Sequence, residues 1–224
     1  MHYVELYGTI METETQKLVS EDNEVYMELR EQILEGTLQV FNYKGLKFTM
    51  DDVAHTLGIS KKTIYTVFSN KQEMFLELVD YLFDGIKDEE QKVMDDDSLS
   101  TVDKIRKILG VMPVSYRELD LRQLYILKDK YPVVYHKVEQ RLENGWENTI
   151  SLIEQGIAEG VIRPIKIPIL KMMLEASLEQ FFIRDVLIEN KITYSEGLDE
   201  VVEILVDGIL LNSTDNNKLG RLQK

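Results

Sequence analysis

Phe48 to Lys71, FTMDDVAHTLGISKKTIYTVFSNK, predicts two short helices separated by a glycine turn. Thr49 precedes a periodic segment and can cap the free N–H groups of a helix that we expect to run from about Met50 to Leu57. Asp52 stands three residues after Thr49, the spacing of a capping box. Gly58 follows the last periodic residue, where a left-handed backbone suits a residue without Cβ, so the chain should turn there.

The second helix of this stretch has the features of a helix that reads DNA. Ser60 can cap it, and Ile64 and Phe68 are four residues apart and therefore share its inward face. Its outward positions carry lysines and hydroxyls, which suit DNA because ammonium groups, hydroxyl donors and the helix dipole all favour phosphate oxygens and base edges. The residues predicted to bind DNA are Thr49, Ser60, Lys61, Lys62, Thr63, Tyr65 and Lys71.

A longer helix should follow the recognition helix. Ser69 and Gln72 have the spacing of a capping box that would start it, and Lys71 would then lie at a helix N-terminus, where anions bind. We expect this helix to continue to about Val93 and to link the DNA-binding domain to the rest of the chain.

Together these positions resemble the N-terminal domain of TetR-family transcriptional regulators. Taken singly, the apolar residues also fit an ordinary core and the lysines a solvated face, but their combination at fixed spacing favours the resemblance. It departs from the family pattern at Lys62 and at Thr66-Val67, so an operator sequence cannot be carried over. The positions that carry it are Phe41, Gly45, Thr49, Val53-Ala54, Gly58-Ile59-Ser60, Thr63-Ile64-Tyr65, Phe68 and Asn70-Lys71.

The charge distribution agrees with a DNA-binding segment, although the net charge of −14 argues at first against a polyanionic partner. Five lysines and two aspartates between Lys44 and Lys71 give this segment a charge of +3, which leaves −17 for the other residues. A short stretch can be basic by chance, and this one gains weight because it coincides with the helix-turn-helix.

The composition and motifs give no support to an enzyme. The chain has no cysteine, and its three histidines lack the spacing of a metal site. There is no Gly-x-Ser-x-Gly elbow, phosphate loop or dinucleotide-binding motif. We therefore expect no catalytic residue, no metal and no cofactor. No secretory signal or apolar run of membrane-spanning length is present, so a cytoplasmic protein without a membrane partner is the simplest expectation.

The rest of the chain predicts an all-α protein of about nine helices, without strands or repeats. We expect an N-terminal arm or frayed helix at 1–24, a three-helix DNA-binding domain at 25–71, a larger helical bundle at 72–213 and a polar tail at 214–224. One helix should start at Pro132 and continue to Gly160, a length of about 40 Å at roughly 1.5 Å per residue. The resemblance implies that the larger bundle dimerises and often holds an effector.

Aromatic and sulfur-containing residues suggest where an effector would bind. Bundle interiors host small ligands, and Met and aromatic walls adapt to them, although ordinary core packing is the favoured explanation for any one of these residues. The predicted lining of an apolar effector pocket is Met112, Tyr116, Tyr125, Trp146 and Phe181.

Two apolar stripes near the C-terminus predict a homodimer interface. Leu198, Val202, Leu205 and Ile209 recur at spacings of four, three and four, a seam suited to packing against another helix. The preceding helix offers Met172, Met173 and the small Ala176. Both stripes could instead face only their own bundle, and the sequence does not separate these two alternatives.

These features predict a sequence-specific DNA-binding regulator. We expect a homodimeric repressor that binds a palindromic operator and is released from it by a small apolar effector. Lys61, Lys62 and Thr63 would contact bases or nearby phosphates, and Thr49, Tyr65 and Lys71 would position the protein through the DNA backbone. The alternative is a helical protein-interaction module that retains the fold without useful DNA binding, which the acidic net charge permits.

Overall fold

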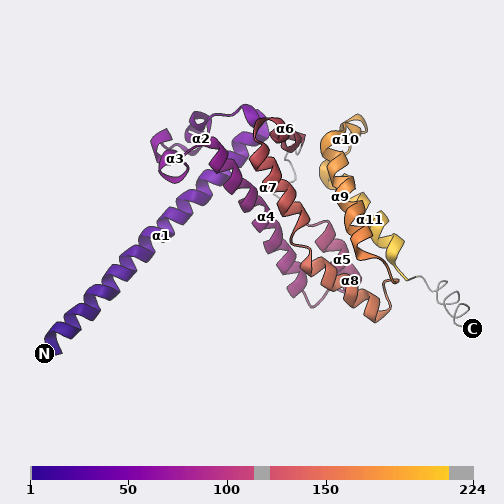
Figure 1. Cartoon of the computed structure of the whole chain (residues 1–224), viewed down its shortest axis with the longest axis horizontal. Helices are drawn as coiled ribbons and strands as arrows, with labels where there is room; N and C mark the ends of the chain where they lie inside the picture. Colours follow the sequence, from indigo (N-terminus) through magenta and orange to yellow (C-terminus); the bar gives the residue numbers. More distant parts are fainter. Residues whose placement is uncertain (1, 114–121, 212–224) are drawn as a thin grey trace, which may run out of the picture. The chain divides into compact units, whose positions relative to one another are not determined.

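The computed structural model describes residues 2–113 and 122–211 of the chain (Figure 1). Within these ranges the regular structure is α-helical, apart from one 3-10 turn and an isolated antiparallel bridge between Ile162 and Leu210. The predicted all-α class is therefore confirmed. The chain divides into two compact units, Met1–Leu78 and Val79–Lys224.

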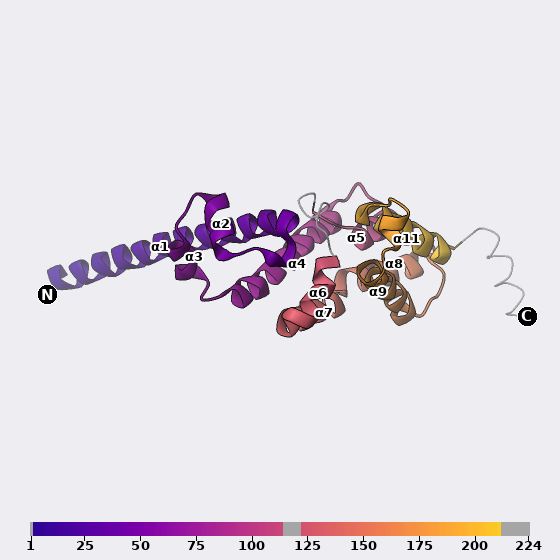
Figure 2. The same ribbon diagram turned by 90° about the horizontal axis from the view of Figure 1, so that it is seen from above.

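The first unit holds a long helix and a small helix-turn-helix. Figures 1 and 2 show α2 and α3 beside the C-terminal part of α1, while the N-terminal part of α1 extends beyond them. Residues 2–24, predicted as an arm or a frayed helix, belong to α1 in the structure. The elements of this unit are α1 (His2–Lys44), the turn η1 (Gly45–Lys47), α2 (Met50–Leu57), α3 (Lys61–Val67) and the first part of α4 (Lys71–Asp95).

Apolar side chains from every element of the first unit meet in one core. Ile33, Val53 and Ile64 have no exposed surface, so α1, α2 and α3 each contribute to it. The Phe48 and Phe75 rings meet edge to face, with centroids 5.4 Å apart. At Gly36 of α1 an added Cβ would lie 2.7 Å from the Leu57 side chain, so α2 approaches α1 where α1 has no side chain.

The second unit is a bundle of the remaining helices. Most of them bury apolar faces in a common core that includes Ile105, Leu152, Leu174 and Val206. They are the rest of α4, α5 (Thr101–Leu109), α6 (Arg122–Lys130), α7 (Pro132–Glu143), α8 (Glu147–Glu159), α9 (Ile167–Ile183), α10 (Val186–Glu189) and α11 (Tyr194–Ile209).

The prediction of a single helix from Pro132 to Gly160 is wrong. It is broken between α7 and α8, where Gly145 adopts a left-handed backbone with φ of 81°. Both halves keep the apolar period, and the period alone does not reveal the break. With this break and the short α10, the described helices exceed the nine expected.

The N-terminus of α4 also differs from the expectation. The helix starts at Lys71, and Glu73, not Gln72, serves the capping residues. The Glu73 carboxylate accepts from the Ser69 backbone N–H at 2.8 Å, and the Asn70 carboxamide oxygen accepts from the Glu73 N–H at 2.9 Å. Asn70 rather than Ser69 is therefore the cap, one residue later than predicted.

Candidate functional site

The first helix of the helix-turn-helix, α2, is fixed by a closed capping box. Asp52 N–H donates to the Thr49 hydroxyl, and the Asp52 carboxylate accepts from the Thr49 backbone N–H at 2.8 Å. Lys44 Nζ lies 2.6 Å from the same carboxylate. The Lys44 ammonium and the Thr49 donors lower the pKa of Asp52 to about 2. The hydroxyl of Thr49, a residue predicted to bind DNA, therefore caps the N-terminus of α2.

The turn between α2 and α3 has the predicted geometry. Gly58 adopts φ of 66°, and its N–H bonds back to the carbonyls of Ala54 and His55. The Ile59 N–H also donates to the Ala54 carbonyl, at 3.0 Å. These bonds satisfy the last carbonyls of α2 and redirect the chain within two residues.

Ser60 caps α3 as predicted, and the helix presents a polar outer face. The Ser60 hydroxyl accepts from the Thr63 N–H at 3.0 Å, and the two hydroxyls lie 2.8 Å apart. Ile64 is fully buried, whereas Tyr65 is 46% exposed. Lys62 is exposed and makes no hydrogen bond or ion pair with the described part of the chain. Its ammonium is thus available to an anion outside the molecule.

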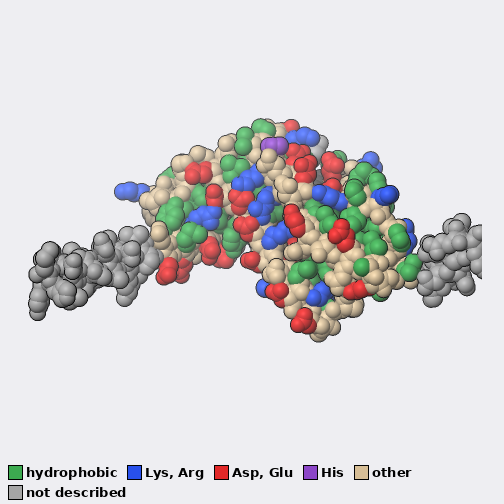
Figure 3. All heavy atoms as spheres, turned by 60° about the horizontal axis from the view of Figure 1, so that its bottom comes forward, with side chains coloured by type: hydrophobic (Ala, Val, Ile, Leu, Met, Phe, Trp, Pro, Cys, Tyr) green, Lys and Arg blue, Asp and Glu red, His purple; other side chains and the backbone are tan. Residues whose placement is uncertain are grey.

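Lys61, next to Lys62, has a partner within the first unit. Lys61 Nζ lies 2.6 Å from the Asp51 carboxylate, and this ion pair raises the pKa of Lys61. Both side chains are largely exposed, so the pair is weak and DNA phosphates can compete for Lys61. Figure 3 shows Lys and Arg side chains interspersed with Asp and Glu on the face that it draws.

Lys71 lies in a different environment. Its ammonium donates to the carbonyls of Leu46, at 2.9 Å, and Phe48, and it stands 3.8 Å from the centroid of the Phe48 ring. These contacts tie the N-terminus of α4 to the segment between α1 and α2. The structure thus shows a structural role for Lys71 beside the predicted contact with DNA.

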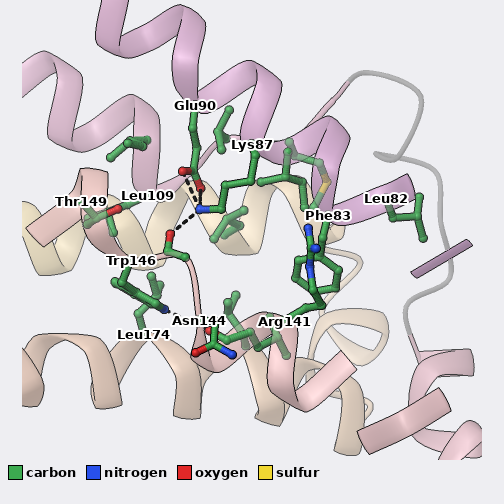
Figure 4. A pocket seen from close by; sticks show the side chains of 18 of the residues that line it. Leu82, Phe83, Lys87, Glu90, Leu109, Arg141, Asn144, Trp146, Thr149 and Leu174 are labelled. Carbon is green, nitrogen blue, oxygen red and sulfur yellow. Dashed lines mark hydrogen bonds and ion pairs between the residues drawn. The ribbon is translucent and has the colours of Figure 1, made fainter. Parts of the chain in front are cut away.

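The second unit contains a cavity of about 200 Å³ between α4, α5, α7, α8, α9 and α11. Its walls are mainly apolar, and Glu90 is the buried charge among them, with 7% of its surface exposed. Lys87 Nζ donates to both Glu90 carboxylate oxygens, at 2.8 and 2.6 Å, and to the Gly145 carbonyl (Figure 4). Burial raises the pKa of Glu90 despite this ammonium.

The structure brings together part of the predicted effector pocket. Met112 and Trp146 line the cavity. Phe181 does not line it, but its ring meets that of Tyr194, a lining residue, with centroids 5.9 Å apart. Tyr116 lies outside the described residues, and the side chain of Tyr125 does too. Sequence reasoning missed Lys87 and Glu90, whose i, i+3 spacing on a helix resembles an ordinary surface pair.

The predicted dimer residues separate into two groups. Leu198, Val202, Leu205 and Ile209 are at most 8% exposed and belong to the core of their own unit. Met172 and Met173 of α9 are 55% and 49% exposed, and Ala176 is exposed as well. On α11 the exposed apolar residue is instead Ile204, at 63%.

Two kinds of feature are absent from the part of the chain that the structure describes. Across residues 2–113 and 122–211, no group of three or more His, Cys, Asp or Glu side chains is placed to hold a metal ion. None of the helices in these ranges combines the length and the hydropathy needed to cross a membrane.

The capped α2, the left-handed turn and the outward lysines of α3 define a DNA-binding regulator of the helix-turn-helix class. The family described as "Bacterial regulatory proteins, tetR family" matches residues 33–78. YhgD of Bacillus subtilis (strain 168), an uncharacterized HTH-type transcriptional regulator, is 31% identical over 137 residues, 59% of this chain and 71% of that protein. The chain belongs to the TetR family and is a DNA-binding transcriptional regulator, not an enzyme.

Other proteins of this kind resemble more of the chain. YvaF of Bacillus subtilis (strain 168), another uncharacterized HTH-type regulator, is 25% identical over 177 residues, 79% of this chain and 93% of that protein. The HTH-type transcriptional repressor KstR2 of Mycolicibacterium smegmatis is 24% identical over 164 residues, 70% of this chain and 74% of that protein. The structure of FadR from Bacillus subtilis in complex with stearoyl-CoA shares the fold, with a TM-score of 0.57 and 19% identity over 80% of this chain and 98% of that one.

Proposed function

We propose that this regulator acts as a homodimeric repressor that binds a palindromic operator and leaves it when a small apolar effector occupies the cavity of the second unit. The observation that carries the proposal is the two-sided character of α3. It buries Ile64 in the core of the first unit and exposes Lys62 and Tyr65 to an outside partner.

The DNA contacts follow from this geometry. Lys62 would bind a phosphate or a base edge directly, because its ammonium has no partner among the described residues. Lys61 would first exchange Asp51 for a phosphate. The hydroxyls of Ser60 and Thr63 lie 2.8 Å apart at the N-terminus of α3, where donors and the helix dipole favour a phosphate.

The second copy of the chain would pack against the exposed apolar residues of α9 and α11. Ile169, Met172, Met173 and Ile204 each keep about half or more of their surface exposed in the isolated chain. The hollow between α9 and α11 is lined by Ile169, Met173 and Ile204 and is large enough to receive apolar side chains of a partner. Such a dimer would present two α3 helices to major grooves about 34 Å apart.

Effector control is proposed from the cavity and from the course of α4. This helix starts in the first unit and continues into the second, where its residues Lys87 and Glu90 line the cavity. A ligand that changes the position of α4 can therefore affect α3. A 100-fold loss of operator affinity needs a coupling free energy of about 2.7 kcal/mol, and the operator must weaken effector binding by the same factor. KstR2, to which the chain is similar, is described as a transcriptional repressor, and this similarity supports repression rather than activation.

Selection of genomic fragments that bind the purified protein tests DNA binding and yields the operator at once. On the selected site, a dimer that neutralises about five phosphates should give a slope of log K against log salt of about −4 to −5. No enrichment of any fragment, together with no retention on DNA at low salt, would refute the proposal and leave the protein-interaction module in its place.

A further inference from the structure

The cavity of the second unit is small and has a particular polar end. Its volume of about 200 Å³ is somewhat larger than the roughly 150 Å³ of an engineered cavity that binds benzene, so it suits a substituted benzene or an aliphatic chain of about eight to ten non-hydrogen atoms. The apolar walls come from several helices and include Leu82, Ile86, Leu109, Val138, Leu174 and Leu198.

The hydrogen-bonding capacity of the ion pair between the half-buried Lys87 and the buried Glu90 is unequally used. An ammonium group has three protons, and Lys87 Nζ has three acceptors: the two Glu90 oxygens and the Gly145 carbonyl. A carboxylate has about four acceptor sites, yet Lys87 is the one donor that Glu90 has within the described residues. The unused capacity at this point is therefore that of an acceptor, Glu90.

Thr149 supplies a second, independent polar group. It is 5% exposed, lines the same cavity, and its hydroxyl forms no hydrogen bond with any residue that the structure describes. Figure 4 shows Thr149 of α8 and Glu90 of α4 at the same end of the cavity. The hydroxyl therefore has a free hydrogen-bonding capacity at the cavity wall, and a ligand atom would satisfy it.

Neighbouring donors are already engaged. Trp146 Nε1 donates to the Leu142 carbonyl at 3.0 Å, and the Arg141 guanidinium is bound to Asp84 and Asp80. A ligand carboxylate at the polar end would have the Thr149 hydroxyl as a donor but would lie beside the charge of Glu90, and a ligand ammonium would lie beside Lys87. A neutral group avoids both repulsions.

We infer that the cavity binds a small apolar molecule with one neutral hydroxyl group, a phenol or an alcohol, whose O–H donates to Glu90 and whose oxygen accepts from Thr149. This inference rests on the proposed function, in which the cavity is the effector site. It specifies the chemical class of the effector and the two residues that select it.

The test uses the fluorescence of Trp146, which lines the cavity and is the single tryptophan of the chain. The full-length protein is titrated with 4-ethylphenol, with its methyl ether 4-ethylanisole, and with 4-ethylbenzoate and 4-ethylbenzylammonium. We expect 4-ethylphenol to bind at least about tenfold more tightly than each of the other three. Equal binding of the ether, tighter binding of either ion, or no response to the phenol up to millimolar concentration would overturn the inference.

Two variants connect the selectivity to its residues. Glu90→Gln should reduce the preference for the phenol over the ether to about threefold or less. Should this variant not fold, Lys87→Met combined with Glu90→Leu removes both charges together, which is the better tolerated change, and should abolish the preference. Thr149→Val should weaken the phenol and the ether alike and leave ethylbenzene unchanged. Thr101→Val, outside the cavity, is the matched control and should change none of the affinities.

The outcomes also separate this inference from the proposed function. If the phenol binds selectively but does not release the operator, the selectivity stands and the proposed switch fails. If 4-ethylbenzoate binds more tightly and releases the operator, the switch stands and the inferred hydroxyl class is wrong.

Discussion

Two lysines of the same motif, Lys71 and Lys62, should differ in role. Replacing Lys71 should lower stability, and replacing Lys62 should weaken DNA binding. Lys71 is held by the carbonyls of Leu46 and Phe48 and lies over an aromatic ring, whereas Lys62 has no partner among the described residues. Methionine keeps most of the apolar stem of each side chain and removes the charge. Lys71→Met and Lys62→Met are thus a matched pair.

The magnitudes follow from these contacts. Hydrogen bonds from a charged group contribute about 1.5–3 kcal/mol, and Lys71 is half-buried, so we expect Lys71→Met to lower the free energy of unfolding of the first unit by about 2 kcal/mol. Exposed substitutions without partners usually stay within about 0.5 kcal/mol, which is the expectation for Lys62→Met. For DNA the order reverses. Loss of one phosphate contact per protomer should make the salt slope of a dimer less steep by about 2.

Urea unfolding followed by circular dichroism reports on both units, and Trp146 fluorescence reports on the second. Lys71→Met should shift the circular dichroism transition and leave the fluorescence transition in place. Lys62→Met should shift neither transition and should flatten the salt dependence of operator binding. If Lys71→Met were as stable as the wild type and changed the salt slope as Lys62→Met does, Lys71 would be a phosphate contact and the structural role would be refuted.

Three further predictions concern the turn, the capping box and the dimer. Gly58→Ala and Gly160→Ala both place a Cβ in open space at positive φ, so each should lower the free energy of unfolding by about 1–2 kcal/mol. Of the two variants, Gly58→Ala alone should shift the unfolding transition of the first unit, and an unchanged stability would contradict the left-handed geometry. The pKa of Asp52 should be about 2 in a carboxyl NMR titration and should rise in Lys44→Met, because the Lys44 hydrogen bond is the main cause of the shift. Since this pKa is lowered in the folded state, the stabilisation from Asp52 is complete above about pH 4 and is lost as the pH falls through 2. Ile204→Glu should give folded monomers in sedimentation, and a variant that remained dimeric would exclude this face of α11 as the interface.

The bounds of the helix-turn-helix follow from the amino-acid sequence almost to the residue. Helix α2 begins and ends where Thr49 and Gly58 predict, and Ser60 starts α3. These signals are local, because a cap satisfies N–H groups two or three residues away and a glycine permits positive φ wherever the rest of the chain lies. Where two local caps competed at the start of α4, the sequence indicated Ser69 and the structure has Asn70.

The packing of the helices fixes which side chains face each other. The stripe Leu198, Val202, Leu205 and Ile209 has the same period whether it packs inside the bundle or against a second chain, and the fold places it inside. The pairing of Lys87 with Gly145, 58 residues further along, has no sequence signal, since it depends on how α4 meets the break between α7 and α8. Periodicity and caps report interactions over a few residues. Contacts between helices far apart in the chain depend on the packing of the whole unit, and the polar end of the cavity is made of such contacts.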